Sequence, residues 1–217
     1  MRTFKRVLTV TGVAAASLSM AGLASAVTPV TLSKGHVDVL DVEYASGVLD
    51  LHVHDESVTP DVEYSPADVV LQALPASAYT VPSGSCYSFL GTAGSTVYRL
   101  PEVQNSNLLW PGISGEHLAT GVFQNDRVQA QLVAVSGPGK FSVYKNGLCP
   151  GSTKSFDSGD GISAADSKNV AAGEHSHANW AFSATGTYTL TFKVTGTLTN
   201  GTVVNSANVN YTFKVGA

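Results

Sequence analysis

Strict alternation of apolar and polar residues is the feature that most limits how this chain can fold. GTYTLTFKVTG, residues 186–196, places a large apolar side chain at every second position, and GVLDLHVHDE, residues 47–56, does the same. A period of two is that of a half-buried β-strand. The first of these stretches is soon followed by Asn200-Gly201, a pair typical of tight turns between strands. The pattern therefore predicts amphipathic strands joined by short turns.

The rest of the chain continues this pattern, and helical periodicity is nearly absent. We predict one short helical turn around 164–168 and a long ordered loop over 101–127. The segment Gly186-Thr187-Tyr188 matches the corner tyrosine of immunoglobulin-like sandwiches. Short strands between Gly, Pro and Asn turns indicate an immunoglobulin-like or jelly-roll-type antiparallel β-sandwich. Further strands are expected at 36–44, 68–74, 96–100, 128–136 and 178–183, in KFSVYKNGLC before an Asn-Gly turn, and in VNYTFKV.

The first 26 residues predict a secretory signal peptide. A basic start precedes a small, apolar stretch that ends in Ala24-Ser25-Ala26, an A-x-A cleavage pattern. The remaining residues, 27–217, are expected to form a single domain that contains no membrane-spanning segment. Without its three N-terminal basic residues the chain keeps nine of 12 Lys and Arg against 16 Asp and Glu, a net charge of about −7. This acidity argues against binding to nucleic acid.

Cys86 and Cys149 are the chain's two cysteines. In an exported protein such a pair predicts a disulfide bond. It would close a loop of about 64 residues and stabilise the fold by roughly 4 kcal/mol in the chain-entropy model. The alternative is a pair of thiolate metal ligands, but the local spacing of a C-x-x-C ligand pair is absent.

Four of the six histidines occur as two H-x-H pairs, His52/His54 and His175/His177. Residues i and i+2 of a strand share a face and lie about 6.5–7 Å apart, so two imidazoles can converge on one ion. The other reading is an exposed strand that carries solvated polar residues. Two such pairs favour a transition-metal site.

The other two histidines also follow glycine-containing turns. His117 and His175 each end a GEH sequence, and His36 ends KGH. Glu116 and Glu174 are candidate ligands or orienting partners of an imidazole. Zinc suits this imidazole-rich set best; copper(II) and nickel bind similar ligands, and manganese becomes more plausible if carboxylates take part. The full predicted set is His36, His52, His54, His117, His175, His177, Glu116 and Glu174.

A run of motifs in one order covers essentially the whole of 27–217. It includes GHVDVLDVEY, LHVHDE, YSFLGTAGSTVYRLPEVQN, LLWPGISGEH, SGPGKFSVYKNG and AAGEHSHANWAFSATGTYTLTF. In these motifs the chain resembles the actinobacterial surface-anchored protein domain family, the choice-of-anchor M domain, whose shorter version is the ABC-transporter-associated repeat. The resemblance implies an exported protein encoded beside a zinc or manganese ABC transporter. It places His175 and His177 inside the family motif.

Three functions follow from these observations. The first is an exported, zinc-binding protein of the cell surface or exterior that works with a metal ABC transporter or its binding protein. The second is a structural or adhesive surface domain that needs no metal. The third, a metal-dependent hydrolase with Glu116 or Glu174 as its base, has no supporting spacing or substrate motif, so we expect no enzyme activity. The C-terminal NYTFKVGA carries no anchor tail, which favours a released or non-covalently held protein.

Overall fold

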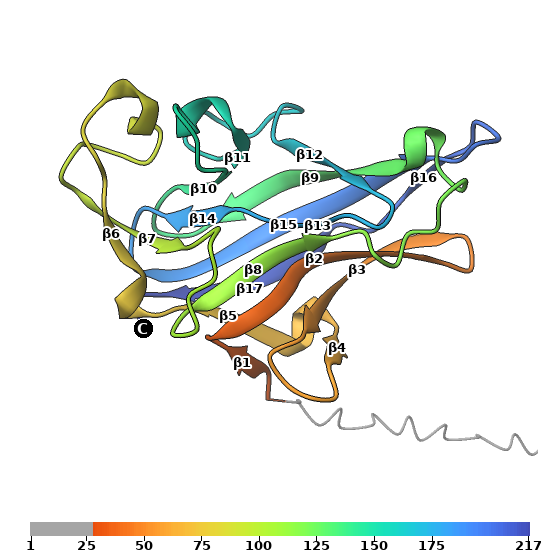
Figure 1. Cartoon of the computed structure of the whole chain (residues 1–217), viewed down its shortest axis with the longest axis horizontal. Coiled ribbons are helices and arrows are strands. Elements are labelled where there is room, and N and C mark those ends of the chain that lie inside the picture. The colour runs from red at the N-terminus through yellow and green to blue at the C-terminus, as the bar shows by residue number, and fades with distance from the viewer. Residues whose placement is uncertain (1–27) are drawn as a thin grey trace, which may run out of the picture.

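The computed structural model describes residues 28–217, which form three β-sheets with short 3₁₀ turns between strands (Figure 1). The predicted signal peptide lies outside the described residues. The seven-stranded sheet contains β1 (Val30–Leu32), β5 (Val69–Ala73), β17 (Val209–Val215), β15 (Gly186–Thr197), β9 (Arg127–Ser136), β12 (Ser167–Ala171) and β16 (Val203–Asn205), which pairs with β15. The first five-stranded sheet contains β11 (Lys154–Asp157), β10 (Phe141–Tyr144), β14 (Asn179–Phe182), β7 (Thr96–Leu100) and β6 (Ala78–Thr80). The second contains β13 (His175–His177), β8 (Leu109–Ser114), β2 (Gly35–Ala45), β3 (Val48–Asp55) and β4 (Val62–Tyr64).

Five 3₁₀ turns complete the described structure. They are η1 (Pro66–Asp68), η2 (Pro75–Ser77), η3 (Ser85–Tyr87), η4 (Gln124–Asp126) and η5 (Pro150–Ser152). Most strand pairs are antiparallel, but β2 runs parallel to β8, and β5 runs parallel to both β1 and β17. No helix within residues 28–217 is long and apolar enough to cross a membrane.

The core joins the seven-stranded sheet to both smaller sheets. Trp180 of β14 packs against Phe213 of β17, with ring centroids 5.8 Å apart, and Phe182 packs against Tyr188 of β15. From the second small sheet, β2 and β3 contribute buried aliphatic residues to the same cluster, among them Val42 and Leu51. The predicted all-β sandwich is therefore confirmed.

The alternation found in the sequence corresponds directly to burial. Along β15 the apolar positions are fully buried and the threonines between them are partly exposed, and β3 repeats this pattern. Tyr188 donates its hydroxyl to the carbonyl of Ala184 at 3.0 Å, which is the bond expected of a corner tyrosine. Gly201 has a φ of +88°, a conformation that glycine adopts without strain, and it closes the predicted turn.

Three local predictions are wrong. The expected loop over 101–127 contains strand β8, which Pro111 and Gly112 hide from a search for strand-forming residues. The expected helical turn at 164–168 is instead a turn that leads into β12, because Ser167 and Lys168 already pair with β9. After β10 the chain forms a loop over 145–149, which leads to η5, instead of the expected Asn-Gly turn.

The segment expected as one strand over 178–183 also differs in an instructive way. The chain forms β13 in one small sheet, passes Ala178, and continues as β14 in the other. The aromatic residues of β14 enter the core, while the histidines of β13 stay at the edge strand of their own sheet. This change of sheet places His175 and His177 beside β8 and β2.

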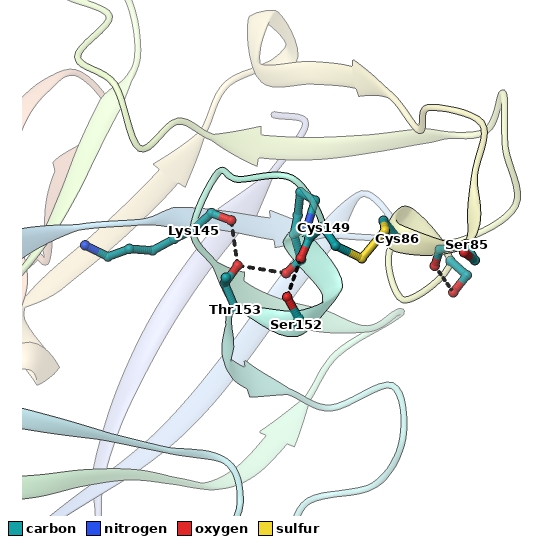
Figure 2. Close-up of a disulfide and its surroundings, with 8 residues drawn as sticks. Ser85, Cys86, Lys145, Cys149, Ser152 and Thr153 are labelled. Carbon is teal, nitrogen blue, oxygen red and sulfur yellow. Dashed lines mark hydrogen bonds between the residues drawn. A yellow bond between two sulfur atoms is a disulfide. The ribbon is translucent and has the colours of Figure 1, made fainter.

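Cys86 and Cys149 form the predicted disulfide, with Cα atoms 4.9 Å apart (Figure 2). The bond joins η3 to the loop before η5. Figure 2 shows that this loop is also held by hydrogen bonds from Thr153 to the carbonyl of Lys145 and from Ser152 to that of Cys149. Disulfides of this kind are typical of proteins in oxidising compartments. Both cysteines are bonded to each other, so the thiolate metal pair is excluded.

Candidate metal centre

One face of the sheet β13-β8-β2-β3-β4 carries most of the chain's imidazoles. The backbone register places His177, Gly112, Asp38, His54 and Glu63 in one row across its five strands. In the neighbouring row His175 stands opposite Ser114, Ser114 opposite Asp41, and Asp41 opposite His52. We call this surface, which bears His36, His52, His54, His175 and His177, the histidine face.

A β-bulge in β2 brings two carboxylates to the histidine face. Asp38 and Asp41 are three residues apart, so a regular strand would point them to opposite sides. The register of β2 shifts between them against both β3 and β8, so Val39 and Leu40 together occupy the place of one residue. Val39 and Leu40 are both buried in the core, and Asp38 and Asp41 lie among the imidazoles.

Three side chains on this face bring one ligating atom each to a common place. His36 Nε2 lies 2.9 Å from His175 Nε2, and Asp38 Oδ1 lies 3.3 Å from the first nitrogen and 3.0 Å from the second. A zinc ion about 2.0–2.1 Å from each of its tetrahedral ligands spaces those ligands about 3.3 Å apart. The triangle therefore has nearly the dimensions of one face of a zinc coordination shell.

His177 completes this group. One of its ring nitrogens lies within 4.8 Å of ligating atoms of both His36 and His175. Its Nδ1 donates to the carbonyl of Pro111 at 3.0 Å, since a carbonyl oxygen can only accept. Nε2 of the neutral ring thus keeps a lone pair for a cation. We call His36, Asp38, His175 and His177 the central cluster.

Asp38 is the least expected member of the cluster. Its side chain is fully buried, and neither of its oxygens has a hydrogen-bond partner among the described residues. Its nearest polar neighbours are the Nε2 atoms of His36 and His175, at 3.3 and 3.0 Å. Gly112 leaves the space that the Asp38 carboxylate occupies, because a Cβ on Gly112 would lie 1.8 Å from Asp38 Oδ1. A buried carboxylate without a partner costs several kcal/mol, which a bound cation would offset.

Further carboxylates orient the imidazoles from behind. Glu56 contacts Nδ1 of His36 in an ion pair, and Glu116 Oε2 lies 3.4 Å from Nδ1 of His175. Such contacts fix the tautomer and ring position of a metal-binding histidine and raise its basicity. Trp110 stacks on His177, with ring centroids 3.6 Å apart and planes 9° apart. Each ring of the central cluster is thus held by a neighbour.

The pKa values in the cluster diverge. The Asp38 carboxylate is the main cause that raises the pKa of His36 above 6.5, and it outweighs burial, which acts the other way. Burial, assisted by the charges of His36 and His175, lowers the pKa of His177. A proton and a metal ion compete for the same nitrogens, so these shifts make His177 available to a metal at lower pH than His36.

The other predicted residues are placed as follows. His54 and His117 form a neighbouring group with Asp41, whose ligating atoms lie within 4.8 Å of one another. His52 lies apart, between Glu43 at 3.5 Å and Glu63 at 2.7 Å. Glu116 stands behind His175 as a partner of its Nδ1.

Glu174 does not face the clusters, so its prediction as a ligand or base is not supported by its position. Its carboxylate pairs with Lys168 and accepts the backbone N–H of Ala171 at 2.9 Å. Neighbouring residues of a strand or its edge point to opposite sides, which separates Glu174 from His175. Burial is the largest single effect and would raise the pKa of Glu174. The hydrogen bond from the Ala171 backbone and the opposite charge of Lys168 together outweigh burial and lower that pKa.

Sequence reasoning missed Asp38, Asp41 and Glu56. Asp38 follows His36 by two residues, so the H-x-D spacing in KGHVD was the available signal for one of them. Nothing in the sequence indicated the bulge that brings Asp41 to the same face. Glu56 was hidden because its partner His36 is 20 residues away in sequence and becomes a neighbour through the pairing of β2 with β3.

Comparisons with known proteins do not add a family to this geometry. No protein-family model matches the chain, and no curated protein and no solved structure matches it significantly. The resemblance to the surface-anchored domain family therefore stays a prediction.

Proposed function

We propose that this protein binds zinc outside the cytoplasm through the central cluster, and that it captures the ion or passes it on for uptake. The observation that carries the proposal is the buried, unpartnered carboxylate of Asp38, which lies 3.0–3.3 Å from the Nε2 atoms of His175 and His36. A polar group buried in this way is normally satisfied by the protein. Here the three atoms lie as ligands of one cation would.

The composition of the cluster favours zinc. Three imidazoles and one carboxylate suit zinc, copper(II) and nickel, whereas manganese and magnesium prefer mostly oxygen ligands. The distances between donors agree with a small tetrahedral shell. Copper(II), which favours a tetragonal arrangement, is the closest competitor.

The number of protein donors favours holding the ion over catalysis. A catalytic zinc site keeps three protein ligands and one position for water or substrate, whereas a closed site uses four protein ligands. His177, which has a ring nitrogen within 4.8 Å of ligating atoms of His36 and His175, is available as a fourth donor. We therefore place capture or transfer before hydrolysis.

The proposal also includes export of the protein and a transporter partner. The predicted signal peptide and the Cys86–Cys149 disulfide support a place outside the cytoplasm. Cooperation with a metal ABC transporter or its binding protein is supported by the family resemblance. A surface domain without metal remains the alternative, and the following experiment separates the two.

The experiment measures zinc bound by the dialysed protein and the melting temperature with and without zinc. At a free zinc concentration 100 times the Kd, binding stabilises the fold by about 2.7 kcal/mol. For a domain of this size that is roughly a 5–10 °C rise. The His36→Ala/His175→Ala variant should lose both the bound zinc and the rise.

Two matched variants control for effects unrelated to the cluster. Glu174→Gln changes the residue next to His175 but leaves the four donors in place, and His52→Ala removes a histidine of the same face outside the central cluster. Both should keep the zinc of the central cluster. Absence of bound zinc and of any melting shift in the unmodified protein would leave the metal-free surface domain as the function.

A further inference from the structure

A second group of ligating side chains lies next to the central cluster on the histidine face. Asp41 comes from β2, His54 from β3, and His117 from the loop after β8. His117 Nε2 is 3.7 Å from Asp41 Oδ2, and one ligating atom from each residue lies within 4.8 Å of the other two. The rings of His54 and His117 have centroids 5.9 Å apart. We call Asp41, His54 and His117 the outer cluster.

Asp41 supplies an observation independent of this convergence. Its side chain is 1 % exposed, and neither of its oxygens has a hydrogen-bond partner among residues 28–217. Asp55 in the paired strand β3 is also buried, but its Oδ1 accepts the N–H of Ser57 at 2.9 Å. The fold thus gives the buried carboxylate of Asp55 a backbone donor and gives Asp41 none.

His54 is oriented as a ligand would be. Its Nε2 lies 2.8 Å from Asp61 Oδ2, and an ionised carboxylate can only accept, so Nε2 carries the proton in the neutral ring. The lone pair is then on Nδ1. A carboxylate behind an imidazole is the usual partner of a metal-binding histidine.

The two clusters share the acidic residues Asp38 and Glu56. Asp38 belongs to the central cluster and also has a ligating atom within 4.8 Å of both His54 and Glu56. Glu56 contacts Nδ1 of His36 through Oε2, and its Oε1 is 3.8 Å from Nδ1 of His54. Asp38, Asp41 and Glu56 together carry three negative charges when ionised. One divalent cation balances two of these charges, and the remaining negative charge favours a second cation nearby.

We infer that Asp41, His54 and His117 form a second zinc site, which binds zinc more weakly than the central cluster beside it. This inference is based on the proposed function and extends it from one ion to two. His117 and Asp41 are 3.7 Å apart, whereas His36, Asp38 and His175 are 2.9–3.3 Å apart, and His117 is 49 % exposed on a loop. A site with three protein donors keeps a position for water, so zinc enters and leaves it more easily. The outer cluster would therefore receive or release the ion that the central cluster holds.

The test is a calorimetric titration of the metal-free protein with zinc chloride. Two binding events of unequal affinity are expected. His117→Ala should remove the weaker event and leave the tighter one, and His175→Ala should weaken the tighter event. His117 is exposed, so its removal leaves the core intact, and circular dichroism checks that each variant is folded. His52→Ala is the matched control and should keep both events.

The outcomes separate this inference from the proposed function. A single tight event in the unmodified protein, or two events that both survive His117→Ala, would overturn the second site and leave the central site standing. Loss of both events in a folded His117→Ala variant would overturn the division into two sites. No binding at all would overturn both proposals.

Discussion

Two places in this protein bury a pair of aspartates, and they treat them in opposite ways. Near β11, Asp166 accepts the backbone N–H groups of Asp157 and Ser163 at 2.7 and 2.8 Å. Asp157 in turn pairs with Lys154 and accepts the N–H of Gly159 at 2.9 Å. On the histidine face, Asp38 and Asp41 are at least as deeply buried but lack such donors.

The difference contrasts an acid pair that the protein itself completes with one that is left available to a ligand. Backbone N–H groups and a lysine complete the first pair, so that region is finished without any ion. The second pair is surrounded by imidazoles, which bind a metal as readily as a proton. The pair of satisfied acids is therefore an internal reference for the unsatisfied pair, and each prediction below tests that contrast.

The largest effect is expected at the satisfied pair. Asp166→Ala removes both acceptors and leaves two backbone donors without partners, which should lower the free energy of unfolding by about 3–5 kcal/mol. Urea unfolding monitored by circular dichroism measures this loss. The loss should be the same with and without zinc, and a zinc-dependent loss would mean that this corner also serves the metal.

Asp38→Asn should act with the opposite sign on the metal-free protein. At about pH 8, removing an unpartnered buried charge should raise the free energy of unfolding by about 1–3 kcal/mol. Zinc affinity should fall by about 100-fold or more, because the variant replaces an ionised ligand with a neutral amide. Urea unfolding and a zinc titration measure the two effects. A less stable metal-free variant with normal zinc affinity would show that Asp38 is a structural acid after all.

Gly112→Ala tests whether the space over β8 positions Asp38. The added Cβ would lie 1.8 Å from Asp38 Oδ1, so the carboxylate must move. Moving a ligand without removing it should lower zinc affinity by roughly 10- to 100-fold. Gly147→Ala is the matched control, since nothing lies within 4 Å of its added Cβ and its φ is not positive. Equal zinc affinities for the two variants would refute the role of Gly112.

The smallest effect is a pH dependence of a few degrees in melting temperature. Nearby carboxylates, Asp38 above all, raise the pKa of His36. For His54, burial is the largest single effect and lowers the pKa, but the carboxylates around it, led by Asp61, together outweigh burial and raise the pKa. A raised pKa means that the folded state binds the proton more tightly, so this stability is present below 6.5 and is lost as pH rises through the folded pKa. The metal-free protein should therefore melt lower at about pH 8 than at about pH 6, while the rise caused by zinc should grow. Melting curves at both values, with and without zinc, measure this, and a metal-free protein that is more stable at the higher pH would contradict it.

The sequence predicted the parts of the fold that obey a regular period. Alternation in β3 and β15, the turn at Gly201 and the corner tyrosine Tyr188 are all local patterns, and each was found as expected. The disulfide followed from the number of cysteines. Strand β8 was not predicted because Pro111 and Gly112 are poor strand formers. These two residues contact His177 and Asp38, and those contacts form only when the sheet is assembled.

The candidate site was predictable in its imidazoles and unpredictable in its acids. The spacing of His175 and His177 predicted one pair of candidate ligands, although their meeting with His36 depends on the change of sheet at Ala178. Asp41 reaches the histidine face only because of the bulge in β2. A bulge interrupts the period of two by which a strand is recognised in a sequence. Glu174 misled because adjacency to His175 in sequence is not adjacency in space.

The stack of Trp110 on His177 has a practical consequence. The chain has two tryptophans: Trp110 lies flat against an imidazole of the central cluster, and Trp180 is fully buried against Phe213. An imidazole that takes on positive charge draws electron density from an excited indole in contact with it. If the central cluster binds zinc as proposed, the fluorescence of Trp110 should change with occupancy while that of Trp180 stays constant, so the native chain would report binding without any added label.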